Sequence, residues 1–211
     1  MEFFAVIDTN VFVSALLTQN SQSATVKVLR LIKEEKITPM YNEDIFKEYS
    51  DVLYREKFGI DVTQVKELLD AIQSCGINCE RKRSNCLMPD PNDIVFYEIS
   101  LSREDAYLVT GNLKHFPKNG RVVSPADMVQ IVSLAECPKD VLCEPRRPKY
   151  QSEEEREICE RGWAAFEELR RQAVINGTAG ISLEEINEEI RLARKEIRER
   201  KAREQAAKQT E

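Results

Sequence analysis

Two short apolar runs that end in polar residues constrain the fold of this chain more than any other feature. The first covers residues 3–7 and is followed by Asp8-Thr9-Asn10, and the second covers residues 106–110 and is followed by Gly111-Asn112. Runs that are apolar throughout and bounded by polar turns are typical of buried parallel strands. Because helical patterns lie between them, the sequence predicts an α/β layered fold with a mainly parallel sheet.

Apolar residues at helical spacing indicate several helices around these strands. We expect helices over residues 11–17, 24–35, 43–58, 62–75, 93–102 and from Ser124-Pro125, short strands over 37–41 and 122–123, and strand or loop over 77–92. Asn42 and Ser124 are residue types that favour helix N-caps, and Pro125 then stands at the first helical position.

The charge balance argues against a protein that holds nucleic acid by overall positive charge. The formal net charge is −6, and neither the first 150 residues nor the remainder is basic. Any affinity for nucleic acid must therefore come from local patches and bound metal. No apolar run approaches the ~20 residues that span a membrane, and the start lacks a basic signal-peptide region. We expect a cytoplasmic chain with no membrane contact.

The six cysteines are scattered and form no Cys-x-x-Cys pair, which disfavours a zinc site or a disulfide framework. Composition changes near residue 142, so we divide the chain into a domain (1–137), a linker (138–152) and a helical tail (153–211). Capping boxes at 152–155 and 182–185 each begin a helix of this tail. Trp163, Phe166 and Leu169 form the apolar stripe of the first helix, and Ile186 and Ile190 belong to that of the second.

Four polar residues are expected to meet at one edge of the sheet. Asp8 and Asn112 follow the two buried strands, Asp93 begins a helix, and Glu48 shares a helix face with residues that should point inward. Converging carboxylates repel one another unless a cation neutralises them. Oxygen ligands select Mg²⁺ or Mn²⁺, which in such a site serve phosphodiester hydrolysis.

Each of these residues also has a purely structural interpretation. Asp8 could cap the following helix, Glu48 could be solvated, Asp93 is an ordinary N-cap, and Asp90 and Asn112 are ordinary turn residues. A phosphatase with Asp8 as nucleophile is a competing interpretation. Such an enzyme would require a second Asp two positions later, where this chain has Asn10.

In combination, four segments resemble the PIN-domain family, specifically its toxin components of bacterial toxin–antitoxin pairs. They are Asp8-Thr9-Asn10, Glu48-Tyr49, Asp90-Pro91-Asn92-Asp93 and residues 107–116. The resemblance covers residues 2 to about 135 and implies an α/β/α sandwich with Mg²⁺- or Mn²⁺-dependent endoribonuclease activity. It makes Asp8, Glu48 and Asp93 metal ligands and, with Asn112, the catalytic set; Asn112 stands where the family more commonly has Asp. Thr9, Asn10, Lys114 and His115 are then candidate RNA contacts, with His115 structural or RNA-facing rather than a general base.

Residues 160 to 195 resemble the toxin-binding segment of small antitoxins. Because the linker is long enough for the tail to reach the domain, we expect the tail, in cis or in trans, or a cognate antitoxin, to cover the site. Arg191, Arg194, Lys195 or Arg198 would then compete with the metal ion. Two further interpretations stay open. The tail helices could pack on the domain or form a homodimer, and Asn112 could mark a catalytically degenerate binding module.

Overall fold

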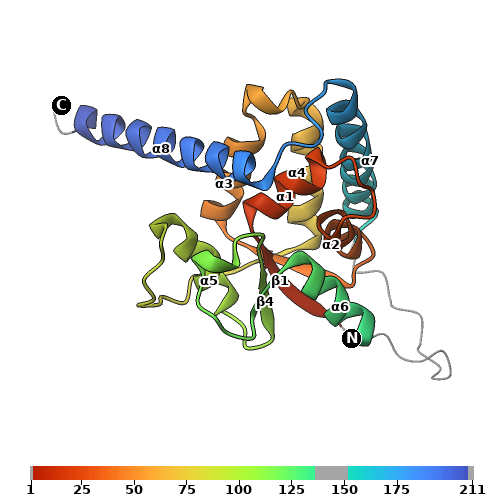
Figure 1. Ribbon diagram of the computed structural model, residues 1–211, viewed down its shortest axis with the longest axis horizontal. Coiled ribbons are helices and arrows are strands. Elements are labelled where there is room, and N and C mark those ends of the chain that lie inside the picture. Colours follow the sequence, from red (N-terminus) through yellow and green to blue (C-terminus); the bar gives the residue numbers. More distant parts are fainter. Residues whose placement is uncertain (1, 136–151, 209–211) are drawn as a thin grey trace.

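The computed structural model describes residues 2–135 and 152–208, and it contains a central parallel sheet (Figure 1). The strands are β1 (Phe3–Ile7), β2 (Ile37–Tyr41), β3 (Ile77–Asn78), β4 (Ala106–Val109) and β5 (Val122–Val123). Their order is β3-β2-β1-β4-β5, and each neighbouring pair is parallel. Each of the predicted strands is present, and β3 falls in the segment that was expected to be strand or loop.

Helices cover both faces of the sheet. They are α1 (Thr9–Leu17), α2 (Ala24–Lys33), α3 (Glu43–Leu53), α4 (Val62–Cys75), α5 (Ile94–Ser100), α6 (Pro125–Ala135), α7 (Glu153–Ile175) and α8 (Leu183–Lys208). Helix α5 packs on β1, β2 and β4, and α1, α4 and α7 gather on the other side (Figure 1). The arrangement confirms an α/β/α sandwich with a C-terminal helical extension. None of the helices in the described ranges is long and apolar enough to cross a membrane.

The order of the strands creates a crevice between β1 and β4. From β1 the chain moves to β2 and β3 on one side, and it later returns to β4 and β5 on the other. In open parallel sheets, ligands bind beyond the carboxyl ends of the strands at such a switch point. Asp8 follows β1, and Thr110 follows β4, so both lie at this crevice.

The helix predicted over residues 43–58 is interrupted. Helix α3 ends at Leu53, and a separate 3₁₀ turn follows at Glu56–Phe58. Between them Arg55 adopts an extended conformation (φ −68°, ψ 129°) and binds carboxylates of α8. One of these contacts joins residues 134 positions apart, which local periodicity does not encode.

Helix α7 belongs to the core of the domain. It packs along α4, and Trp163, Phe166 and Leu169 join the main cluster of buried side chains. At Gly162 the two helices touch so closely that an added Cβ would lie 2.2 Å from the Ala71 Cβ. No larger residue fits there unless the helices separate. Helix α7 is therefore closely packed into the domain.

Helix α8 is attached differently. A short connection with positive φ at Gly177 and Gly180 leads from α7 into it. Its first turns cross α1 and α3, and its later turns project away from the body of the molecule (Figure 1). Apart from Ser152, the linker predicted over residues 138–152 lies outside the described residues.

Candidate active site

Asp8 lies directly after β1 and is the N-cap of α1. Its Oδ1 accepts the Asn10 backbone N–H, and its Oδ2 accepts 2.6 Å hydrogen bonds from the Asn10 side chain and the Thr110 hydroxyl. Asp8 does cap the helix, as its structural interpretation proposed, but it is also buried beside other acids. Burial first, and then the Asp93 carboxylate, raises the pKa of Asp8 to about 7. The Thr110 hydrogen bond and the Arg194 charge lower this pKa but do not offset the effect of burial and of the neighbouring acids.

Glu48 reaches the same place from α3. It shares the buried face of that helix with Ile45 and Val52, as the sequence predicted. The Thr9 hydroxyl donates a 2.6 Å hydrogen bond to Glu48 Oε1. Because Thr9 itself is fully buried, it holds Glu48 in position from beneath the site.

The turn Pro91–Asp93 brings two further carboxylates to the crevice. Asp90 Oδ1 accepts the Asn92 backbone N–H at 2.9 Å, which is the turn that the sequence indicated. Asp93 is buried, and its Oδ2 lies 2.8 Å from His115 Nδ1. His115 thus orients Asp93 rather than standing free at the centre of the site. We call Asp8, Glu48, Asp90 and Asp93 the carboxylate cluster.

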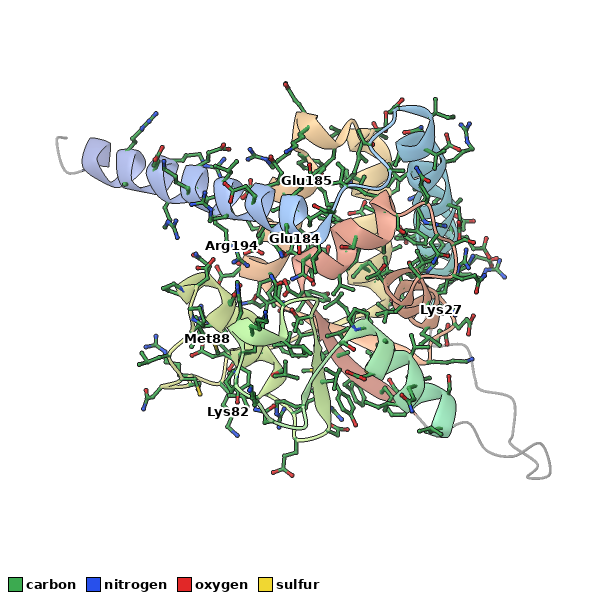
Figure 2. All side chains as sticks on the ribbon, in the orientation of Figure 1. Lys27, Lys82, Met88, Glu184, Glu185 and Arg194 are labelled. Atoms are coloured by element: carbon green, nitrogen blue, oxygen red, sulfur yellow. The ribbon has the colours of Figure 1, made fainter. Side chains whose placement is uncertain are left out.

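The side chain of Arg194, from α8, occupies the middle of this cluster. Its Nε and Nη2 each lie 2.9 Å from a Glu48 carboxylate oxygen, and its Nη1 lies 2.8 Å from both Asp90 Oδ2 and Asp93 Oδ1. The residue is only 7% exposed. Burial opposes its charge, but Glu48, Asp93 and Asp8 together raise the pKa of Arg194 far above its ordinary value. Figure 2 shows Arg194 on the part of α8 that lies over the domain.

Other residues of α8 fasten the helix near this contact. Asn187, two turns before Arg194, donates a 3.1 Å hydrogen bond to Asn112 Oδ1. Glu189 is buried and binds Arg55 at 2.8 Å and Lys57 at 2.7 Å. Polar contacts therefore hold the helix over about two turns, from Asn187 to Arg194.

Beside Arg194 lies a cavity of about 640 Å³. Its wall combines both parts of the chain and includes Asp8, Asn10, Asp93, Asn112, His115, Asn187, Ile190, Arg191 and Arg194. Among the RNA contacts expected from the sequence, Asn10 and His115 line this cavity, whereas Thr9 is covered and Lys114 is exposed in the neighbouring 3₁₀ turn.

The tail residues divide between two places. Ile186, Ile190 and Arg194 are buried in the contact of α8 with the domain, whereas Arg191 is exposed and pairs with Glu188. Trp163, Phe166 and Leu169 pack in the core through α7, not over the carboxylates. Sequence reasoning passed over Asp90 and Asn187 as members of the site. The spacing of Asn187 seven residues before Arg194, on the same helix face, was the available signal.

The donor chemistry of the cluster fits a hard divalent cation. Carboxylate oxygens and the Asn112 amide oxygen are the ligand types that Mg²⁺ and Mn²⁺ prefer. With Arg194 in place, no three acidic, histidine or cysteine side chains of the described ranges are placed to hold a metal ion. The Arg194 guanidinium lies between Glu48 and Asp93.

The sequence profile of the PIN domain matches residues 5–114, which is more than half of the chain. The chain belongs to the PIN domain family. Searches of curated proteins and of solved structures gave no match. PIN domains are generally nucleases and typically use divalent metal ions, and the matched region contains Asp8, Glu48, Asp90, Asp93 and Asn112. Arg194 and the rest of α8 lie outside the matched PIN region.

Proposed function

We propose that this PIN domain is a metal-dependent endoribonuclease of the toxin type, restrained by its own helix α8. The observation that carries the proposal is the binding of Arg194 to Glu48, Asp90 and Asp93. Asp8, Glu48, Asp93 and Asn112 are the proposed catalytic set, with Mg²⁺ or Mn²⁺ as the cofactor and RNA as the substrate.

The environment of Asp8 supports a role in metal chemistry. Arg194 supplies one positive charge to four carboxylates, and the pKa of Asp8 is nevertheless raised to about 7. Burial is the main cause, and the Asp93 and Glu48 carboxylates add to it, so a second positive charge would favour the ionised form of Asp8. When bound, the metal ion would supply activation of water and stabilisation of the leaving oxygen. Thr9, Thr110 and His115 hold Glu48, Asp8 and Asp93 through hydrogen bonds, so the acids keep their positions.

The energetics of Arg194 support restraint as its role. A buried ion pair costs so much desolvation that apolar residues of similar volume stabilise a fold equally well or better. Arg194 is therefore poorly explained by stability alone. A guanidinium with two parallel bonds to Glu48 is instead a specific occupant of an anionic site. The contact lies within one chain here, and the same helix could serve a second copy in a homodimer.

The test compares full-length wild type with Arg194→Ala and Lys195→Ala. Purified proteins are incubated with single-stranded RNA in Mg²⁺ or Mn²⁺, with and without chelator. Lys195 is the matched control, because it is the next cation on α8 but is exposed and reaches none of the four carboxylates. Arg194→Ala should cleave at least tenfold faster than wild type, Lys195→Ala should not, and chelator should stop both.

Two results would contradict parts of the proposal. Equal cleavage by wild type and a folded Arg194→Ala protein would exclude restraint by this residue. Cleavage that survives Asp8→Asn in the Arg194→Ala background would exclude the assigned catalytic set.

Asn112 favours a second candidate, a PIN-fold binding module without nuclease activity. An amide at this position lowers the negative charge available to a metal ion, and its oxygen is bonded to Asn187. Titration calorimetry with Mn²⁺ separates the two candidates. If Arg194→Ala binds no metal in the millimolar range and cuts no RNA, the binding module is the better description.

A further inference from the structure

A second cavity lies on the other side of Arg194. Its volume is about 260 Å³, and its charged lining consists of Asp44, Lys47, Glu48, Arg81, Arg194 and Arg198. Pro91, Arg194 and Arg198 line both this cavity and the larger one beside Asp8. The Arg194 side chain therefore forms part of the wall of both cavities beside the carboxylate cluster.

A buried acid outside the carboxylate cluster fixes one cation of the smaller cavity. Glu98 of α5 is 4% exposed, and its Oε2 accepts bonds from the Arg81 Nε at 2.8 Å and Nη2 at 2.7 Å. Its Oε1 accepts the Ser84 backbone N–H at 2.8 Å, and its backbone carbonyl accepts the Lys82 N–H. Glu98 thus holds the whole turn that carries Arg81, and it keeps this guanidinium at the cavity wall with 38% of its side chain exposed.

The second cation, Lys47, lies on α3 directly before Glu48. Its side chain is exposed, and none of the acids in the described ranges forms an ion pair with its amino group. Asp44 also lines the cavity, 3.5 Å from Arg81. The Lys47 amino group can therefore bind an anion that enters the cavity.

We infer that the cavity between Lys47 and Arg81 binds a backbone phosphate of the RNA strand next to the phosphodiester held at the carboxylates. The inference rests on the proposed nuclease function and adds a contact for its substrate. An RNA strand that crosses acidic residues needs a positively charged side chain in contact with a neighbouring phosphate. Contacts with phosphates supply most of the sequence-independent affinity for nucleic acid. Lys47 adjoins the proposed catalytic Glu48 in sequence and shares a cavity wall with it.

The experiment measures RNA binding by full-length protein in which Arg194→Ala opens the site. Fluorescence anisotropy follows a labelled single-stranded RNA in chelator, so that no cleavage occurs. Lys47→Gln is compared with Lys27→Gln, which removes one charge on the side of the molecule away from Arg194 (Figure 2). Lys47→Gln should weaken binding by about three- to tenfold and reduce the slope of log Kd against log salt by about 0.7, the value for one phosphate on a single strand. Lys27→Gln should change neither.

Circular dichroism checks the fold of Arg194→Ala, and Ile190→Ala serves as a second way to loosen α8 without removing the charge that faces the acids. Equal affinities and salt slopes for Lys47→Gln and Lys27→Gln would overturn the inference, as would an opened site that binds no RNA. The nuclease proposal fails separately. If Lys47→Gln weakens binding but metal never induces cleavage, the phosphate contact stands and the catalytic assignment falls. If cleavage is metal-dependent but Lys47→Gln binds RNA normally, the catalytic assignment stands and the phosphate contact is excluded.

Discussion

The guanidinium of Arg194 binds the carboxylate of Glu48 through two parallel 2.9 Å hydrogen bonds, although the residues are 146 positions apart in sequence. The same guanidinium also joins Asp90 to Asp93. One side chain from outside the matched PIN region thus neutralises part of the carboxylate cluster. The chemistry of the site and the position of α8 are therefore coupled, and several measurements can detect the coupling.

Metal ions should stabilise Arg194→Ala more than wild type. Removing Arg194 leaves Glu48 and Asp93 buried without their partner, which costs about 3 to 5 kcal/mol. A divalent cation can replace the lost charge, and ten times its Kd would restore about 1.4 kcal/mol, or roughly 2 to 6 °C in Tm. Differential scanning fluorimetry with Mn²⁺ and with chelator measures this. A larger Mn²⁺ shift in wild type than in the variant would contradict competition between Arg194 and metal.

The free energy of unfolding should fall as pH rises because of the raised pKa of Asp8. Its pKa is 3.8 when unperturbed and about 7 in the folded chain, so the folded state binds more protons between these values. The free energy of unfolding then falls with increasing pH across this window, by at most about 1.4 kcal/mol per pH unit from this group. Asp8→Asn removes the effect. Urea unfolding at pH 5 and pH 8 should show the variant gaining stability relative to wild type at the higher pH; a constant difference would exclude a raised pKa.

Glu189→Gln should loosen α8 without touching the carboxylate cluster. Glu189 is buried and binds both Arg55 and Lys57, and losing hydrogen bonds between charged groups costs about 1.5 to 3 kcal/mol. Each 1.4 kcal/mol raises the population of released helix about tenfold, so RNA cleavage should rise by at least that factor. The matched control is Glu196→Gln, which also loses a bond to Arg55 but is exposed. Equal effects of the two variants would exclude Glu189 as a fastening point.

Asn112→Asp should strengthen metal binding. The substitution adds a negative charge beside the cluster, and Mn²⁺ affinity measured by calorimetry in the Arg194→Ala background should rise on the order of tenfold. RNA cleavage both with and without the substitution would support an active enzyme. Cleavage only after the substitution would support a degenerate site.

The position at which the chain is truncated should decide whether the carboxylate cluster is uncovered or the domain unfolds. A chain that ends after Gly177 lacks α8 but keeps α7, and it should remain folded and cleave RNA faster than the full chain. A chain that ends near residue 145 also loses Trp163 and Phe166 from the core, and deleting one such aromatic side chain alone costs about 3 to 5 kcal/mol. Circular dichroism and cleavage assays distinguish the two. If the shorter chain is folded, α7 is not needed for the domain.

The sheet was predictable because its signals are local. The runs before Asp8 and after Ala106 are apolar throughout, and helices of the right length separate them, so the parallel order follows from short-range pattern. The inward position of Glu48 was predictable for the same reason, since Ile45 and Val52 fix the buried face of α3.

The contacts of the tail were less predictable because amphipathic helices look alike in sequence. Trp163 and Ile190 both belong to apolar stripes and both join the main buried cluster, yet only Ile190 also lines the cavity beside the carboxylates. Gly162 carried a clue, because glycine inside a helix is unfavourable unless another backbone approaches closely. Asp90 was understood only as a turn residue, because its bond to Arg194 joins positions 104 residues apart.

The close contact at Gly162 has a consequence for how such a protein responds to its own abundance. Helix α7 is anchored in the core of the PIN domain, so each molecule carries its α8 on a connection of only a few residues. The proposed restraint by α8 would then be a unimolecular equilibrium, and diluting the protein would not weaken it. Proteolysis of a free partner or unequal synthesis of two chains would not release it either. Only an event that acts on α8 or its contacts would.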